Sequence, residues 1–156
     1  MKIILIYVGN VRDSSLKNLT DRFCERIPHY IPFETSIVPD ISSKGITIQN
    51  RKEKEGKAIL GKISQSDFVV LLDEKGKQIS SRDLAEMIDR KSLESLKNLI
   101  FVIGGPFGFS DEVYSRANHI ISLSKMTFTH EMAIFITTEQ IYRAMTILRG
   151  EPYHHD

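Results

Sequence analysis

The stretch LIFVIGGPFG, residues 99–108, places five apolar residues directly before a loop that contains three glycines. Apolar runs without polar alternation are typical of strands that are buried on both faces of a parallel sheet. The glycine loop is therefore expected at the C-terminal end of a buried strand. In an open α/β sheet that edge is where ligands bind, so the stretch predicts both the fold class and the position of a site.

Similar apolar runs lie on both sides of this stretch and alternate with helical patterns. Strands are expected over residues 2–8, 33–38, 68–72, 99–103 and 119–123. Helices are expected from Asp13 or Ser14 to Ile27, over 47–63 and 81–91, briefly after Ser110, and over 130–149. No repeat or linker interrupts this order. The prediction is one α/β domain over residues 1–156, with a mainly parallel sheet and helices on both faces.

The composition excludes several classes of protein. With 156 residues, 41% hydrophobic and 26% charged, the chain resembles an ordinary globular domain. Its net charge of +1 lacks the basic excess of a non-specific nucleic-acid binder. The apolar stretch Ile3 to Val8 is too short for a membrane span or a signal sequence. Cys24 is the only cysteine, which excludes an internal disulfide and indicates a cytoplasmic protein.

The glycine loop itself raises three interpretations, and its neighbouring residues disfavour one of them. Glycines at a strand-to-helix turn let the backbone approach a ligand closely. A dinucleotide site also needs an acidic residue after the next strand, yet that strand ends in Leu123-Ser124-Lys125. Pro106 also removes an amide that a phosphate cradle could use. The remaining interpretations are a flat, adenine-like ligand bound by main-chain groups, and a tight turn without a ligand.

Two further segments raise similar alternatives. Met126 and Phe128 could form the walls of a pocket for a purine ring or a thioether, or could pack under the last helix. The charged helix over 47–63 carries Arg51 and Glu55 among other charges and is interpreted as a solvated face with internal ion pairs, the alternative being a dedicated RNA-binding patch.

The C-terminal end carries groups with acid, base and hydrogen-bonding capacity. Glu139 and Arg143 are four residues apart and could form only a helix salt bridge. Tyr153 and Arg143 could donate hydrogen bonds, and histidine exchanges protons near neutral pH, which makes His154 a candidate base. His154 and His155 could equally be frayed. We expect the cofactor pocket and these side chains to share one end of the molecule.

Taken together, these motifs resemble the ribosomal RNA large subunit methyltransferase H family. The resemblance rests on LLD (71–73), FVIGGP (101–106), SLSKMTFTH (122–130), EQIYRA (139–144) and GEPYH (150–154), and it extends over the whole chain. It departs from the family pattern at Thr129, Ile134 and His155.

The resemblance implies a SPOUT fold with a C-terminal trefoil knot and methylation of N3 of a pseudouridine in 23S rRNA. S-adenosylmethionine would be the methyl donor, with no metal and no membrane. The implied cofactor residues are Leu72, Gly104, Leu123, Ser124, Lys125, Met126, Thr127 and Phe128, and the implied catalytic residues are His154, Tyr153 and Arg143.

The resemblance also implies a homodimer in which one subunit's tail completes the other's site. For its contact surface we expect the last helix, through Ile141, Met145 and Leu148. The alternative function is a non-catalytic RNA- or nucleotide-binding module on the same fold.

Overall fold

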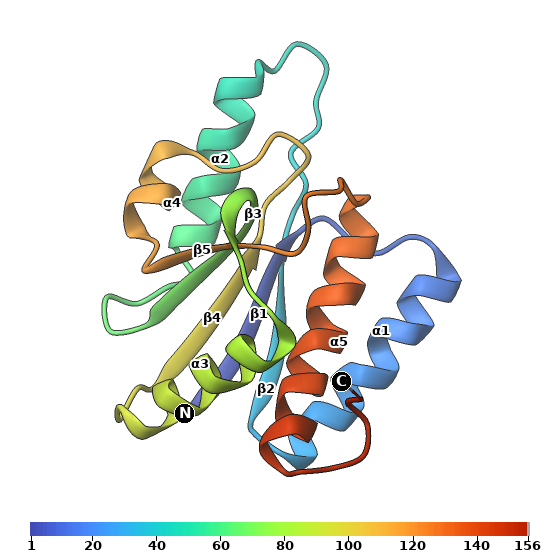
Figure 1. Ribbon diagram of the computed structural model, residues 1–156. Helices are drawn as coiled ribbons and strands as arrows, with labels where there is room; N and C mark the ends of the chain where they lie inside the picture. The colour runs from blue at the N-terminus through green and yellow to red at the C-terminus, as the bar shows by residue number, and fades with distance from the viewer. Residues whose placement is uncertain (156) are drawn as a thin grey trace.

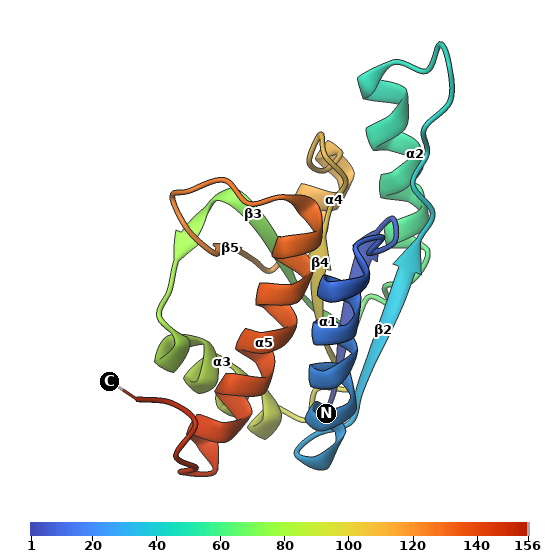
Figure 2. The same ribbon diagram turned by 90° about the vertical axis from the view of Figure 1, so that its right-hand side faces the viewer.

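A computed structural model describes residues 1–155 and contains a five-stranded parallel sheet with helices on both faces (Figures 1 and 2). The strand order is β2-β1-β4-β3-β5. The strands are β1 (Lys2–Val8), β2 (Phe33–Val38), β3 (Phe68–Gln78), β4 (Asn98–Ile103) and β5 (His119–Ser122). The helices are α1 (Ser14–Arg26), the short 3-10 turn η1 (Ile27–His29), α2 (Ile48–Leu60), α3 (Ser81–Leu93), α4 (Asp111–Arg116) and α5 (His130–Leu148).

Strand β4 lies in the middle of the sheet, as its apolar sequence predicts. It pairs with β1 on one side and β3 on the other, and residues 99–103 are all buried. Leu99, Phe101 and Ile103 pack toward α1, α3 and α5. Ile100 and Val102 pack toward α2 and α4 on the opposite face. The two faces therefore hold two apolar cores, and both depend on this strand.

Side-chain caps fix where the helices begin. Asp13 accepts a hydrogen bond from the backbone N–H of Leu16 at 2.9 Å and so caps α1. Ser80 and Asp83 form the reciprocal capping box of α3 that the sequence predicts. Thr129, one of the departures from the family pattern, caps α5 because its hydroxyl oxygen accepts a hydrogen bond from the N–H of Met132.

Strand β3 differs from the prediction because it continues past residue 72. Its pairing with β5 is interrupted between Leu72 and Lys77 and then resumes. Within the interruption, Asp73 accepts a hydrogen bond from the N–H of Lys75 at 2.9 Å. A Cβ on Gly76 would lie 2.5 Å from the carbonyl carbon of Ile121, so only glycine lets the two strands approach here. The strand was predicted to end at residue 72, and its continuation to Gln78 was not predicted.

Two further findings concern the chain as a whole. Within residues 1–155, no helix combines the length and the apolar character needed to cross a membrane. The parallel α/β architecture confirms the predicted fold class. The trefoil knot stays a prediction.

Candidate cofactor pocket and C-terminal tail

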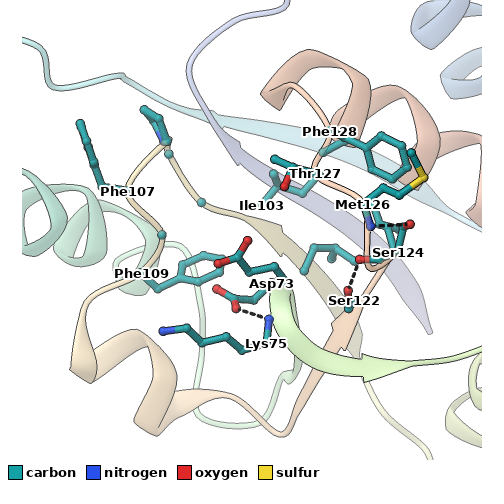
Figure 3. Close-up of a pocket in the computed structure, with 18 of the residues that line it drawn as sticks. Asp73, Lys75, Ile103, Phe107, Phe109, Ser122, Ser124, Met126, Thr127 and Phe128 are labelled. Atoms are coloured by element: carbon teal, nitrogen blue, oxygen red, sulfur yellow. Dashed lines mark hydrogen bonds between the residues drawn. The ribbon is translucent and has the colours of Figure 1, made fainter.

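A cavity of about 360 Å³ lies at the C-terminal edge of the sheet, where the loops after β3, β4 and β5 meet. Figure 3 shows Phe107 and Phe109 on one side of it and Met126, Thr127 and Phe128 on the other. The volume falls in the range of small-molecule sites. Residues from all three loops line it: Leu72, Asp73, Glu74, Lys75, Ile103, Gly104, Gly105, Pro106, Phe107, Gly108, Phe109, Tyr114, Ser122, Leu123, Ser124, Met126, Thr127, Phe128 and Ala133.

The glycine loop folds into a tight turn that brings backbone to the cavity wall. The N–H of Gly108 donates to the carbonyl of Gly105 at 3.0 Å, and Gly108 has φ +76°, a conformation that favours glycine. A Cβ on Gly104 would lie 3.0 Å from the buried ring of Phe109. A side chain at residue 104 would therefore require the Phe109 ring to shift.

The second loop, residues 123–128, keeps its apolar side chains at the cavity. The N–H of Met126 donates to Ser124 Oγ, and Ser122 Oγ donates to the carbonyl of Ser124, both at 2.9 Å. Met126 is 76% exposed and Phe128 is 38% exposed, so neither is buried under α5. The structure thus favours pocket walls over core packing for these two residues.

Seven of the eight residues predicted to hold a cofactor line this cavity. Lys125, the eighth, is exposed and is not part of the wall. The cavity is also lined by Asp73 and Tyr114, which were not among the predicted cofactor residues. The Tyr114 hydroxyl donates to Asp73 Oδ2 at 2.6 Å. Burial and then this hydrogen bond raise the pKa of Tyr114 to about 12.

The charged helix α2 contains the predicted kind of internal ion pair between Arg51 and Glu55, but this pair is buried and is not part of a solvated face. Glu55 is only 4% exposed, and its Oε1 accepts from Arg51 Nε at 2.9 Å. Arg51 also pairs with Asp40, and its guanidinium lies 5.1 Å from the centre of the Phe107 ring. Both residues lie beside the glycine loop, so the pairing has a structural role there.

Two of the three candidate catalytic residues, Arg143 and Tyr153, meet at Glu139. Its Oε1 accepts from Arg143 Nη2 at 2.6 Å and from the Tyr153 hydroxyl at 3.1 Å. The predicted helix salt bridge is therefore present and also holds the tail. Burial, followed by the Glu139 charge, raises the pKa of Tyr153, which keeps this phenol a donor. His154 is half-buried and His155 is exposed.

The tail and the cavity lie at opposite ends of α5, so the expectation that they share one end of the molecule is wrong within a single chain. Figures 1 and 2 show the 123–129 loop at one end of this helix and the C-terminus at the other. The 19 residues of α5 span about 28 Å. The tail instead docks near η1, where the Tyr30 hydroxyl donates to Glu151 Oε2 at 2.7 Å. The helix predicted over 130–149 is present, and its length separates the pocket loop from the tail.

One other expectation about α5 changes as well. Ile134, one of the departures from the family pattern, is fully buried in the core. Ile141 and Met145 are also buried within the chain, so they are not available for the dimer contact that we expected from them. Only Leu148 of that predicted stripe is exposed.

His130, at the start of α5, has a structural contact, since its Nε2 lies 2.5 Å from the carbonyl oxygen of Val8.

In the part of the chain that the structure describes, no group of three or more histidine, cysteine, aspartate or glutamate side chains could hold a metal ion.

Comparison with known proteins agrees with this architecture. The family model described as "Predicted SPOUT methyltransferase" matches residues 1–154. The chain is 51% identical to "Ribosomal RNA large subunit methyltransferase H" of Christiangramia forsetii, with 99% of each chain covered. It is 47% identical to the protein of the same name from Parabacteroides distasonis, with 100% of each covered.

A solved structure supports the fold alone. It is "The structure of a probable methylase family protein from Haemophilus influenzae Rd KW20", with a TM-score of 0.52 and 14% identity. The match covers 99% of this chain and 70% of that one. From the family match and the full-length relatives, we conclude that the chain belongs to the ribosomal RNA large subunit methyltransferase H family of SPOUT methyltransferases.

Proposed function

We propose that this protein transfers the methyl group of S-adenosylmethionine to N3 of a pseudouridine in 23S rRNA. The observation that carries the proposal is the cavity at the sheet edge, which brings together seven residues that the family resemblance assigns to the cofactor. The names of the full-length relatives support a large-subunit rRNA substrate.

The walls of the cavity fit a nucleoside with a thioether-like side chain. The glycine loop offers backbone that can approach a flat ring closely, because Gly104 has no Cβ to keep it away. Met126 and Phe128 supply an apolar surface for the adenine or the sulfur substituents. Pro106 provides no amide, which disfavours a pyrophosphate in the same place. S-adenosylmethionine, when bound, supplies a methyl group on a positively charged sulfur.

The protein's part in the reaction is to hold donor and acceptor in line and to manage one proton. Holding two reactants in the productive geometry can be worth about 7–11 kcal/mol. N3 of the acceptor loses a proton as it is methylated, and we assign the uptake of that proton to His154. Arg143 and Tyr153 would donate hydrogen bonds to the base or its phosphate. Tyr153 is suited to this task because its raised pKa keeps its proton in place.

These residues can act only if the tail of one subunit reaches the cavity of another. Within one chain the length of α5 separates them by about 28 Å. We therefore propose a homodimer in which each cavity is completed by the partner's tail.

Since Ile141 and Met145 are buried within the chain, we propose a different dimer contact. It is the aromatic face that α1 and α5 share. Phe23 lies 6.0 Å from Phe135 and 5.3 Å from Tyr142 between ring centres. All three rings are half-buried in the single chain and sit on neighbouring helices. Aromatic residues are enriched at protein interfaces, which supports this surface over the polar faces of α2 and α3.

Two measurements test the proposed function. Calorimetric titration with S-adenosylmethionine, NAD and ATP should show binding of the first alone. Mass mapping of rRNA from cells that lack the protein should show one pseudouridine without its N3 methyl group. Cofactor binding without any change in the rRNA would favour the alternative, a non-catalytic binding module.

A further inference from the structure

The strand order brings an acidic residue next to the glycine loop. Strand β3 pairs with β4 so that Leu72 lies opposite Ile103. Asp73 and Gly104, the residues that follow this last pair, therefore lie at the same level of neighbouring chain segments at the edge of the sheet. In dinucleotide-binding folds, a glycine loop on one strand and an acid at the end of the adjacent strand hold the two ends of a nucleoside. The sequence analysis looked for this acid after the next strand along the chain, whereas the neighbour in space is the preceding one.

Hydrogen bonds hold the Asp73 carboxylate in one orientation. Oδ1 accepts from the N–H of Lys75 at 2.9 Å, and Oδ2 accepts from the Tyr114 hydroxyl at 2.6 Å. An ideal Cβ on Gly108 would lie 3.9 Å from Oδ2 and 3.6 Å from the Tyr114 oxygen, so this pair faces the glycine loop. Figure 3 shows Asp73 between Phe109 and Lys75.

The carboxylate has acceptor capacity beyond these two bonds. An ionised carboxylate offers about four lone-pair sites, so roughly two remain for a ligand. Tyr114 stays a donor at neutral pH because its pKa is raised to about 12. The Asp73 carboxylate accepts hydrogen bonds and is already held in one orientation, so it suits a ligand that donates from two adjacent hydroxyls.

We propose that Asp73 binds the 2′,3′-diol of the ribose in the nucleoside cofactor and that Tyr114 positions it. This inference rests on the proposed function, since it places the sugar of the same ligand. The negative charge of Asp73 would also disfavour a ligand with a phosphate on that ribose. The site thus selects a nucleoside whose two sugar hydroxyls are free.

Glu74 provides a matched control because it carries the same charge in the same cavity. It lines the cavity but is exposed, whereas Asp73 is half-buried. Glu74→Gln removes one negative charge, as Asp73→Asn does. A general electrostatic effect would appear in both variants, while binding of the diol should appear in one.

The experiment compares S-adenosylhomocysteine with its 2′,3′-dideoxy analogue by calorimetry. Wild-type protein should bind the analogue about 10- to 100-fold more weakly, the effect of losing hydrogen bonds to a charged group. Asp73→Asn should bind S-adenosylhomocysteine weaker by a similar factor and should discriminate much less between the two ligands. Glu74→Gln should retain the discrimination of wild type. Tyr114→Phe should reduce the discrimination between the two ligands by less than Asp73→Asn does, because Tyr114 only positions the carboxylate.

Three results would overturn the assignment. They are equal wild-type affinity for both ligands, full discrimination in folded Asp73→Asn, and an equal loss in Glu74→Gln. The first needs no variant and so does not depend on folding. If wild type binds neither ligand nor S-adenosylmethionine, the proposed function itself fails and the ribose assignment fails with it.

Discussion

The carboxylate of Glu55 occupies the space that a side chain on Gly105 would need, since its Oε2 lies 2.6 Å from the ideal Cβ position. Through this contact the buried end of α2 packs directly on the glycine loop. Arg51 holds the same carboxylate and also lies over Phe107 at the tip of the loop. The shape of the cofactor cavity therefore depends on an ion pair that does not line it.

We predict that Glu55→Ala lowers the free energy of unfolding by about 3–5 kcal/mol, the usual effect of removing one partner from a buried ion pair. Urea denaturation measures this directly. Lys54→Ala, an exposed change on the same helix, should stay within about 0.5 kcal/mol of wild type. Equal stability of the two variants would show that the pair does not support the loop.

Gly104→Val should abolish cofactor binding, because a branched side chain would meet the Phe109 ring and narrow the cavity. The Cβ alone would lie 3.0 Å from that ring, so Phe109 must shift. We expect a stability loss of about 1–3 kcal/mol from this overpacking, with the fold retained. Gly104→Ala is the milder control and should reduce affinity less. Calorimetry that finds normal affinity in folded Gly104→Val would refute this placement of the cofactor.

The strands and the two pocket loops could be predicted because their signals are local. The apolar run before Gly104 and the cap at Ser80 each depend on a few adjacent residues. The acid at Asp73 was missed because its partner strand is set by sheet order, which periodicity does not encode. The burial of Glu55 was not predicted, because the sequence pattern of a charged helix is the same whether one of its carboxylates is exposed or buried.

The position of the tail was predicted wrongly for a different reason. The helix over 130–149 was itself predicted correctly, and it is observed as α5. A helix of 19 residues spans about 28 Å, so it carries the tail away from the cavity within one chain.

Alkaline pH should weaken the fold through Tyr114. Its pKa is raised to about 12 in the folded chain, from 10.0 ordinarily, so the folded state keeps a proton that the unfolded state loses. This contribution is fully present below pH 10 and is lost as the pH rises toward 12. The urea midpoint of wild type should therefore fall more steeply over this interval than that of Tyr114→Phe. Parallel curves for the two proteins would contradict the raised pKa.

His154→Ala should reduce methyl transfer by about 100-fold or more while leaving S-adenosylmethionine affinity close to wild type, because general base catalysis contributes about that much. His155→Ala removes the exposed neighbouring imidazole and should leave the rate unchanged. Arg143→Ala should also lower the rate and weaken RNA binding, although it breaks the ion pair with Glu139 as well. If His154→Ala loses cofactor affinity and keeps its turnover at saturating cofactor, the tail covers the donor site and the assigned role is wrong.

Co-expression of two inactive variants can show whether the tail acts on the partner's cavity. Gly104→Val damages the cavity and keeps the tail, whereas His154→Ala keeps the cavity and damages the tail. In a mixed dimer with exchanged tails, the intact tail of the first subunit meets the intact cavity of the second, giving one working site. Random pairing makes half of the dimers mixed, so methyl transfer should recover to about a quarter of the wild-type value. If each tail served its own cavity, every site would carry one defect and no activity would return. Sedimentation of the wild-type protein provides the companion measurement, and a fully active monomer at micromolar concentration would contradict the shared site.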